Sequence, residues 1–432
     1  MRANRQRSRA AAGSAALAAL VLAVAGCGGT ATADTGELKA SAPPAAPGAA
    51  DQGAAATATE AFGLDLLRQL TAGQAGSNTV LSPSGLATAL AMLLPGARGT
   101  TASELSGVLH ATLPPAQYAA ALGAVDRAAQ SGGGGSTLKE SDTAWTRTGY
   151  QVQQDYLRQL AQDFGTGLRT ADFQKDPEAA RKAVNELVAQ QTEGRVKDLL
   201  PPGSVTARTV LVLTDALYFK GHWAQPFKPD ATTDEPFHEA DGSTVQAPAM
   251  AQTGNFRYAA GGAAGQSWQA VELPYQGDEL AMDLVVPQAG AFDRVRDSLD
   301  GPGLDKVLGA LGGAQVALTM PKFDFSAQED LTQPLTALGV HTAFAPGADF
   351  SGISAPGQQP MWVSDVVQQA DITVDEEGTT AAAGSGVVGV AGAAAPAPDL
   401  IHLDVDRPFL FVIRDVHTGL PLFLGQVTNP VK

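Results

Sequence analysis

A long run of small, uncharged residues lies near the C-terminus of this 432-residue chain. From Gly378 to Pro398 the sequence reads GTTAAAGSGVVGVAGAAAPAP, without a charged or aromatic side chain. Such a run could be a solvated linker, a glycine-rich phosphate loop or an accessible segment that a protease can cut. These functions require different flanks, so the segments on either side decide among them.

The flanks of the run predict strands of a single domain. After the run, Ile401, Leu403 and Val405 alternate with polar residues, which is typical of a strand. PFLFVIRD and PLFLGQV, joined by VHTGL, predict a hairpin of two apolar strands buried on both faces. Residues 371–375, just before the run, are compatible with another strand. A loop of about 20 residues inside one domain is uncommon, and is usually functional or disordered.

The run contains the pattern G-x-G-x-x-G at Gly384, Gly386 and Gly389. In a dinucleotide-binding loop, this pattern follows a strand and opens a helix within a βαβ unit. Here GVAGAAAPAP follows the pattern and predicts no helix, and 43 residues remain after Gly389. We therefore reject the dinucleotide site and expect no cofactor.

Helical patterns dominate the first half of the chain, and strand patterns dominate the second. EAFGLDLLRQL carries its apolar residues at helical spacing. Asp176-Pro177-Glu178 combines a capping acid with a proline in the first turn, and so predicts a helix start. In VALTMPKFDF, Val316, Leu318 and Met320 alternate with smaller or polar residues, which predicts a strand. Without sustained strand–helix alternation, the fold class expected is α+β.

Composition excludes several classes of function. The net charge is −16, and no block of Lys or Arg follows the first ten residues, so a nucleic-acid partner is not expected. The six histidines lie far apart without metal-ligand spacing, and no Walker loop or G-x-S-x-G elbow is present. We therefore predict neither a metal site nor an enzyme.

The N-terminus has the pattern of an export signal. Residues 1–26 combine a basic start with a short apolar run ending in small residues. Val24-Ala25-Gly26-Cys27 resembles a bacterial lipobox, in which the cysteine carries the lipid after cleavage, and Cys27 is the sole cysteine. We expect an exported chain held by a lipid anchor on the outer face of the cell membrane. Plain secretion, with cleavage after Ala25 or Gly26, is the alternative. Residues 27–57, rich in Ala, Pro and Gly, predict a disordered linker.

Several motifs in a fixed order resemble the serpin family of serine protease inhibitors. VDEEGTTAAAG resembles the serpin hinge, and DRPFLFVIRDVHTGLPLFLGQVTNP resembles the signature that follows the serpin bait loop. Upstream, NTVLSPSGLATALAMLLPGARGTTASEL, LVLTDALYFKGHWAQPF and VSDVVQQADITVDEEG are similar to further family motifs. The resemblance covers residues 58–432. It implies an α+β fold with large mixed and antiparallel sheets and an exposed reactive-centre loop at about 376–400.

The resemblance also implies a mechanism. A serine protease attacks the loop of an inhibitory serpin and forms an acyl-enzyme, and the freed loop then inserts into a central β-sheet and distorts the protease. The protein is thus a single-use inhibitor, expected to be a monomer. By period-two alternation, Thr379, Ala381, Ala383, Ser385 and Val387 would face the core after insertion, and all are small or modest in size and uncharged. The hinge residues implied are Glu376, Glu377, Gly378, Thr379, Thr380, Ala381, Ala382 and Ala383.

Family spacing from Glu376 implies a scissile bond between Gly392 and Ala393. The neighbouring residues that would set specificity are Val390, Ala391, Ala394 and Ala395. All of them are small and aliphatic, so the protease expected is elastase-like or subtilisin-like, with a shallow pocket.

Departures from the family pattern leave a second function open. Asp215 replaces the usual asparagine before the F-K-G-x-W motif, and Gln368 replaces the usual histidine ahead of the hinge strand. With Ser82, these residues form the region where the sheet is implied to open, and Gly85 stands where the family usually has serine. Glycines within the run would weaken an inserted strand. The alternative function is therefore a non-inhibitory serpin, acting as a binding module or as a cleavable substrate.

Overall fold

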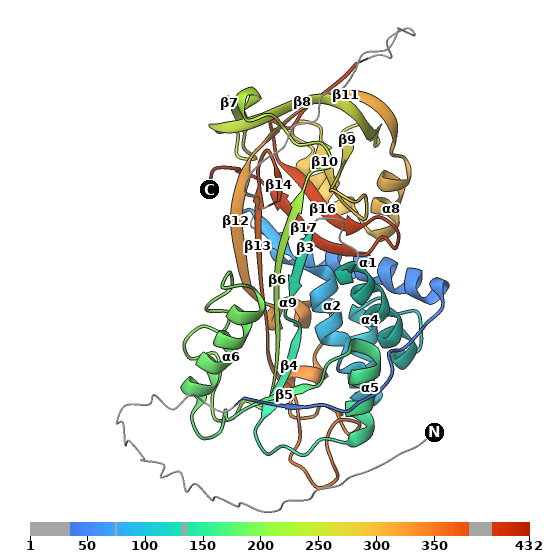
Figure 1. The fold of residues 1–432 in the computed structure, drawn as a ribbon, viewed down its shortest axis with the longest axis vertical. Coiled ribbons are helices and arrows are strands. Elements are labelled where there is room, and N and C mark those ends of the chain that lie inside the picture. The colour runs from blue at the N-terminus through green and yellow to red at the C-terminus, as the bar shows by residue number, and fades with distance from the viewer. Residues whose placement is uncertain (1–34, 74–75, 132–135, 380–399) are drawn as a thin grey trace, which may run out of the picture. The chain divides into compact units, whose positions relative to one another are not determined.

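Two large β-sheets organise the part of the chain that the computed structural model describes, which is residues 35–73, 76–131, 136–379 and 400–432 (Figure 1). We refer to them as sheet A, with eight strands, and sheet B, with nine. The described residues all belong to one compact unit. The α+β class expected from the sequence is confirmed.

In sheet A, the order of neighbouring strands is β1 (Gly36–Leu38), β5 (Leu168–Ala171), β4 (Thr143–Arg147), β6 (Leu211–His222), β14 (Gly378–Thr379), β13 (Val363–Val374) and β12 (Phe323–Asp330), while β3 (Thr137–Glu140) also pairs with β6. In sheet B, the order is β15 (Ile401–Asp404), β11 (Gly312–Pro321), β8 (Thr244–Gly261), β9 (Trp268–Pro274), β10 (Leu280–Pro287), β16 (Phe409–Asp415), β17 (Pro421–Val427) and β2 (Thr79–Leu81), while β7 (Thr233–His238) pairs with β8.

The helices of the described residues surround these sheets. They are α1 (Ala49–Thr71), α2 (Pro83–Ala91), α3 (Gly99–Val108), α4 (Pro115–Ser131), α5 (Gln154–Phe164), α6 (Pro177–Gln191), α7 (Phe292–Ser298), α8 (Gly301–Gly309) and α9 (Thr332–Ala337), with short 3₁₀ turns at Leu94–Gly96, Pro229–Ala231 and Thr342–Phe344. None of the helices in the described part is long and apolar enough to cross a membrane.

Sheet A is covered on both faces, which Figure 1 shows with α6 on one side and α2 and α4 on the other. Successive residues of a strand point to opposite faces, so β6 contributes to two cores. Val212 and Ala216 pack with the buried residues of α6, whereas Leu213 and Leu217 pack in the main core together with α2 and α4. By the same alternation, Asp215 belongs to the face covered by α2 and α4.

The C-terminal hairpin forms as expected. Strands β16 and β17 pair antiparallel, and every residue of both is buried. In β11, Val316, Leu318 and Met320 are all buried, in agreement with their alternation. The helix start is also confirmed, because the Asp176 carboxylate accepts a hydrogen bond of 3.0 Å from the backbone amide of Ala179.

The disordered linker expected over residues 27–57 is wrong from Gly36 onward. Gly36–Leu38 form β1, which pairs antiparallel with β5, and α1 begins at Ala49. Alanine has the highest helix propensity, and its small side chain lets helices approach closely. Ala55 and Ala56 are fully buried, and α1 packs against α4 and α2. The alanines that suggested a linker therefore form the start of a core helix.

Candidate functional site

The chain reverses direction at the end of β13, where the uncharged run begins. The backbone amide of Asp375 donates to the carbonyl of Gly378 at 2.9 Å, which closes a tight turn. The Asp375 carboxylate accepts hydrogen bonds from the amides of Glu377 and Gly378, at 2.9 and 3.2 Å. This side-chain cap fixes the turn and directs the chain back along β13.

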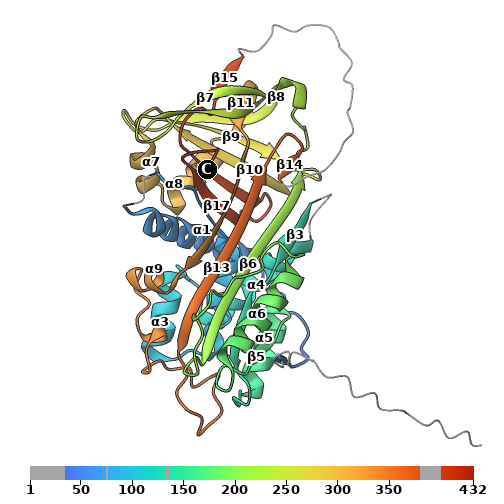
Figure 2. The same cartoon turned by 90° about the vertical axis from the view of Figure 1, so that its left-hand side faces the viewer.

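Strand β14 is lodged between the ends of β6 and β13. Thr379 pairs with Val374 of β13, and Gly378 and Thr379 pair with His222 and Gly221 of β6. Figure 2 shows β6 and β13 side by side, with β14 at their upper ends. A Cβ atom at Gly378 would lie 1.9 Å from the carbonyl oxygen of Gly221, so this position requires glycine. The first two residues of the run are thus already a strand of sheet A.

Below β14, β6 and β13 pair directly with each other. Their parallel register runs from Val363 opposite Leu211 to Asp371 opposite Tyr218. A longer strand could enter at this place only if the direct pairing separated, and the new strand would then pair with both neighbours.

Thr379 is held by a buried aromatic pair. Its side chain is 1% exposed, and its hydroxyl lies 2.7 Å from the hydroxyl of Tyr275. The Tyr275 ring stacks on Trp223 with 4.6 Å between ring centroids. The Trp223 indole N–H donates to the carbonyl of Asp375 at 3.0 Å. These contacts attach the start of the run to β6 and to the sheet B strand β9.

An ion pair and a hydrogen bond hold the side chain of Glu376 in place. One carboxylate oxygen lies 2.8 Å from Lys322 Nζ, and the other accepts a hydrogen bond of 2.8 Å from the Thr232 hydroxyl. Burial alone would raise the pKa of Glu376, but the hydrogen bonds from Lys322 and Thr232 bring that pKa below its ordinary value. The carboxylate is therefore ionised at neutral pH and fastens the outer end of the turn.

Several of the residues expected at the site lie outside the described residues. The chain resumes at Leu400, and β15 then pairs parallel with β11 at the edge of sheet B. The residues concerned are Cys27, Thr380, Ala381, Ala382, Ala383, Val390, Ala391, Gly392, Ala393, Ala394 and Ala395, and their assignments stay predictions.

The structure brings together the three residues expected where the sheet opens. Gln368 of β13 lies directly opposite Asp215 of β6, and both are buried. The Gln368 amide oxygen accepts a hydrogen bond of 3.1 Å from the Ser82 backbone amide. Its nitrogen donates to the Ser82 carbonyl at 3.2 Å and also to the Asp215 carboxylate. One amide side chain thus links β6, β13 and the start of α2.

Gly85 and Asp215 are complementary. A Cβ atom at Gly85 would lie 2.6 Å from both carboxylate oxygens of Asp215. The carboxylate therefore occupies the space that a side chain at position 85 would need. Burial raises the pKa of Asp215 to about 7. The departures at Gly85, Asp215 and Gln368 are thus one packed unit.

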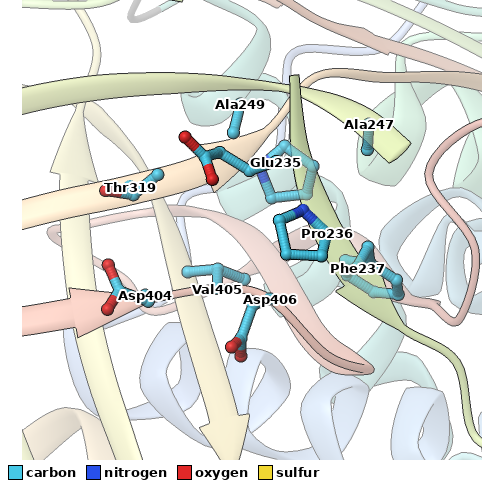
Figure 3. Close-up of a pocket in the computed structure, with 10 residues that line it drawn as sticks. Glu235, Pro236, Phe237, Ala247, Ala249, Thr319, Asp404, Val405 and Asp406 are labelled. Atoms are coloured by element: carbon cyan, nitrogen blue, oxygen red, sulfur yellow. The ribbon is translucent and has the colours of Figure 1, made fainter. Parts of the chain in front are cut away.

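A cavity of about 310 Å³ opens beside β15 (Figure 3). Its wall carries the carboxylates of Glu235, Asp404 and Asp406 around the apolar side chains of Phe237 and Val405. The residues lining it include no serine, cysteine, histidine or lysine, and Thr319 provides the one hydroxyl among them.

The residues that anchor the hinge were not identified from the sequence. Trp223 lies in a motif that was recognised only as a family resemblance, while Tyr275 and Lys322 lie far from the run. Aromatic residues and a lone lysine give no local signal of such a role. Their function becomes evident only when β14 is seen against β6 and β9.

Comparison with known proteins matches nearly the whole of the described unit. The model of the serpin (serine protease inhibitor) family matches residues 57–430. An uncharacterised serpin-like protein of Thermococcus kodakarensis is 35% identical over 376 residues, covering 86% of this chain and 85% of the relative. Plasminogen activator inhibitor 1 of Sus scrofa is 33% identical over 381 residues, covering 87% and 92%.

Solved structures show the same fold. Native protease nexin-1, crystallised with heparin, superposes with a TM-score of 0.77 at 28% identity, covering 88% of this chain and 100% of that one. Human thyroxine-binding globulin in complex with its hormone superposes with a TM-score of 0.78 at 25% identity, covering 88% and 99%. The similar proteins thus include both one that is named as an inhibitor and one that is named for binding thyroxine.

Proposed function

This chain belongs to the serpin family, and we propose that it acts as a single-use inhibitor of serine proteases rather than as a catalyst. The observation that carries the proposal is the position of β14. Gly378 and Thr379 lie between β6 and β13, at the place where a longer inserted strand would begin. The residues that follow are small and uncharged, as burial between two strands requires.

The register of β14 defines where later residues would lie after insertion. If β14 continued antiparallel to β6 in the register of Thr379 and Gly221, Ser385 would lie opposite Asp215. If it also continued antiparallel to β13 in the register of Thr379 and Val374, Ser385 would lie opposite Gln368. A serine hydroxyl can donate to the Asp215 carboxylate and accept from the Gln368 amide. Ser385 would therefore replace the hydrogen bond that now joins β6 directly to β13.

Loop chemistry indicates the class of protease. The residues around Gly392–Ala393 are small and aliphatic, and fit the shallow primary pocket of an elastase-like or subtilisin-like enzyme. The name of plasminogen activator inhibitor 1 supports inhibition as a role within this family. The lipobox pattern at Cys27 supports export and a lipid anchor, which would place the inhibitor at the outer face of the membrane.

The proposal is tested by mixing the purified protein with pancreatic elastase and with subtilisin. We expect loss of protease activity and a band at the summed mass that survives boiling in detergent. A matched variant, Thr379→Arg, places a charge at the buried start of the insertion and should be cleaved without trapping.

Cleavage of the unmodified protein with full recovery of both proteases would contradict inhibition of these enzymes. It would favour the alternative function, a cleavable substrate or a non-inhibitory binding module. Thyroxine-binding globulin shows by its name that a protein of this fold can bind a small molecule.

A further inference from the structure

Four acidic side chains meet between α4 and sheet A. Asp126 lies on α4, Glu140 ends β3, Asp142 lies in the link to β4, and Asp215 lies on β6. One carboxylate oxygen from each of Asp126, Glu140 and Asp142 lies within 4.8 Å of the other two. Asp142 is in turn within hydrogen-bonding reach of Asp215. We refer to these residues as the four-carboxylate cluster.

Among the residues that the structure describes, each member of the cluster has a buried oxygen to which no group donates a hydrogen bond. The Gln130 amide donates to Asp126 Oδ2 at 3.0 Å and to Glu140 Oε2 at 2.7 Å, and leaves the other oxygen of each carboxylate unpaired. Asp142 Oδ1 is also buried without a partner. An unsatisfied buried carboxylate oxygen is costly, so several in one place call for a positive charge.

Asp215 provides an independent sign of a ligand. It comes from a different strand, is 1% exposed, and receives the Gln368 amide at Oδ2 only. Its Oδ1 is buried and receives no hydrogen bond from the described part of the chain. Asp215 is thus a buried polar side chain with an unpaired oxygen beside other carboxylates, an arrangement that suits a bound cation.

Neighbouring cationic side chains are engaged elsewhere. Lys139, next to Glu140, lies 3.6 Å from Glu193. Arg127, next to Asp126, donates to the backbone carbonyl of Asp163.

We propose that the four-carboxylate cluster binds one hard divalent cation, of the class of Ca²⁺ or Mn²⁺. All of its ligand atoms are carboxylate oxygens, which hard cations prefer, whereas zinc and copper sites use histidine or cysteine. The ligand atoms of Asp126, Glu140 and Asp142 all lie within 4.8 Å of one another, and such distances fit one ion, because two oxygens on opposite sides of a calcium ion lie about 5 Å apart. The ion would tie α4 to β3 and β6.

The test is a calorimetric titration of the full-length protein, stripped with EDTA, with CaCl₂ and separately with MnCl₂. We expect binding of one ion per chain and a melting temperature that rises with the ion and then saturates. The double variant Asp126→Asn/Asp142→Asn should weaken binding at least about tenfold. Asparagine keeps the shape and removes the repulsion, so this variant should melt higher than the original protein when no ion is present.

A control separates the cluster from general surface binding. Asp155→Asn removes a carboxylate on α5 whose side chain is 82% exposed, and should leave the affinity for both ions unchanged. If the double variant cannot be purified, Glu140→Gln serves the same purpose. The absence of binding at millimolar calcium and manganese would overturn the proposal and assign shared protons to the cluster. Equal affinity in the cluster variant and the original protein would also overturn it.

Discussion

Under the proposed mechanism of inhibition, replacing Ser385 with aspartate should leave a protein that proteases cleave without being trapped. If the register of Gly378 and Thr379 continued along an inserted strand, residue 385 would lie between Asp215 and Gln368, inside sheet A. Asp215 is fully buried, and its pKa is raised to about 7. At pH 8 the variant would therefore bring a second carboxylate against an ionised one.

The magnitude follows from Coulomb's law. Two like charges about 4 Å apart repel by about 4 kcal/mol at an effective dielectric constant of about 20. If this repulsion is felt before the protease is trapped, insertion slows by about 10³-fold. The acyl-enzyme would then hydrolyse before the loop has entered the sheet. At pH 6, where Asp215 is mostly protonated, the loss should be smaller.

The assay is the number of inhibitor molecules consumed per protease molecule inactivated, measured with elastase at pH 8 and pH 6 in EDTA, so that no bound cation keeps Asp215 ionised. Ser385→Ala removes the hydroxyl without adding charge and should raise this number only modestly. Ala397→Asp adds the same charge beyond the expected scissile bond and should behave like the original protein. If Ser385→Asp traps elastase as efficiently as Ala397→Asp, the register and the reasoning built on it are refuted.

Three further outcomes are expected. Gly378→Ala should displace β14 from sheet A, because its Cβ would lie 1.9 Å from the Gly221 carbonyl oxygen. The hydrogen-exchange rate of the Thr379 amide should then rise, and an unchanged rate would contradict this. Gly85→Ser should lower the unfolding free energy by about 1–3 kcal/mol, because its side chain would clash with Asp215. Urea unfolding measures this loss, and an unchanged unfolding free energy would contradict the clash. Burial, and after it the charge of Asp305, raises the pKa of Glu60 from 4.5 to about 8. The protonated side chain therefore contributes its full stability below pH 4.5, and this contribution is lost as the pH rises to 8. The unfolding free energy should fall by on the order of 2–4 kcal/mol over this range, and Glu60→Gln should reduce that fall. Urea titrations of both proteins at pH 5 and pH 8 measure it, and an equal fall in the variant and the original protein would refute the prediction.

The sequence predicted those helices and strands whose own residue pattern is enough to identify them. The alternation in β11 and the apolar runs of β16 and β17 each define a strand without outside help. The cap at Asp176 likewise depends only on residues of its own turn. By contrast, the alanines of α1 are equally compatible with a linker, and only burial against α2 and α4 shows them to be part of a helix.

The candidate site was predictable to the extent that it is continuous in sequence. The small residues of the hinge indicate a strand that can be buried, but their partners come from distant positions. The complementarity of Gly85 and Asp215 joins residues 130 positions apart, and no spacing rule detects it. The same is true of the four-carboxylate cluster, whose members come together only because α4 lies against sheet A.

The most direct test of the account is the melting temperature of the chain after a single cut in the loop. An added strand between β6 and β13 would form about ten ladder hydrogen bonds, each contributing about 1 kcal/mol. The cleaved protein should therefore melt about 10–20 °C higher than the intact one. A cleaved chain that melts at the same temperature as the intact chain would contradict loop insertion, and with it the proposed mechanism of inhibition.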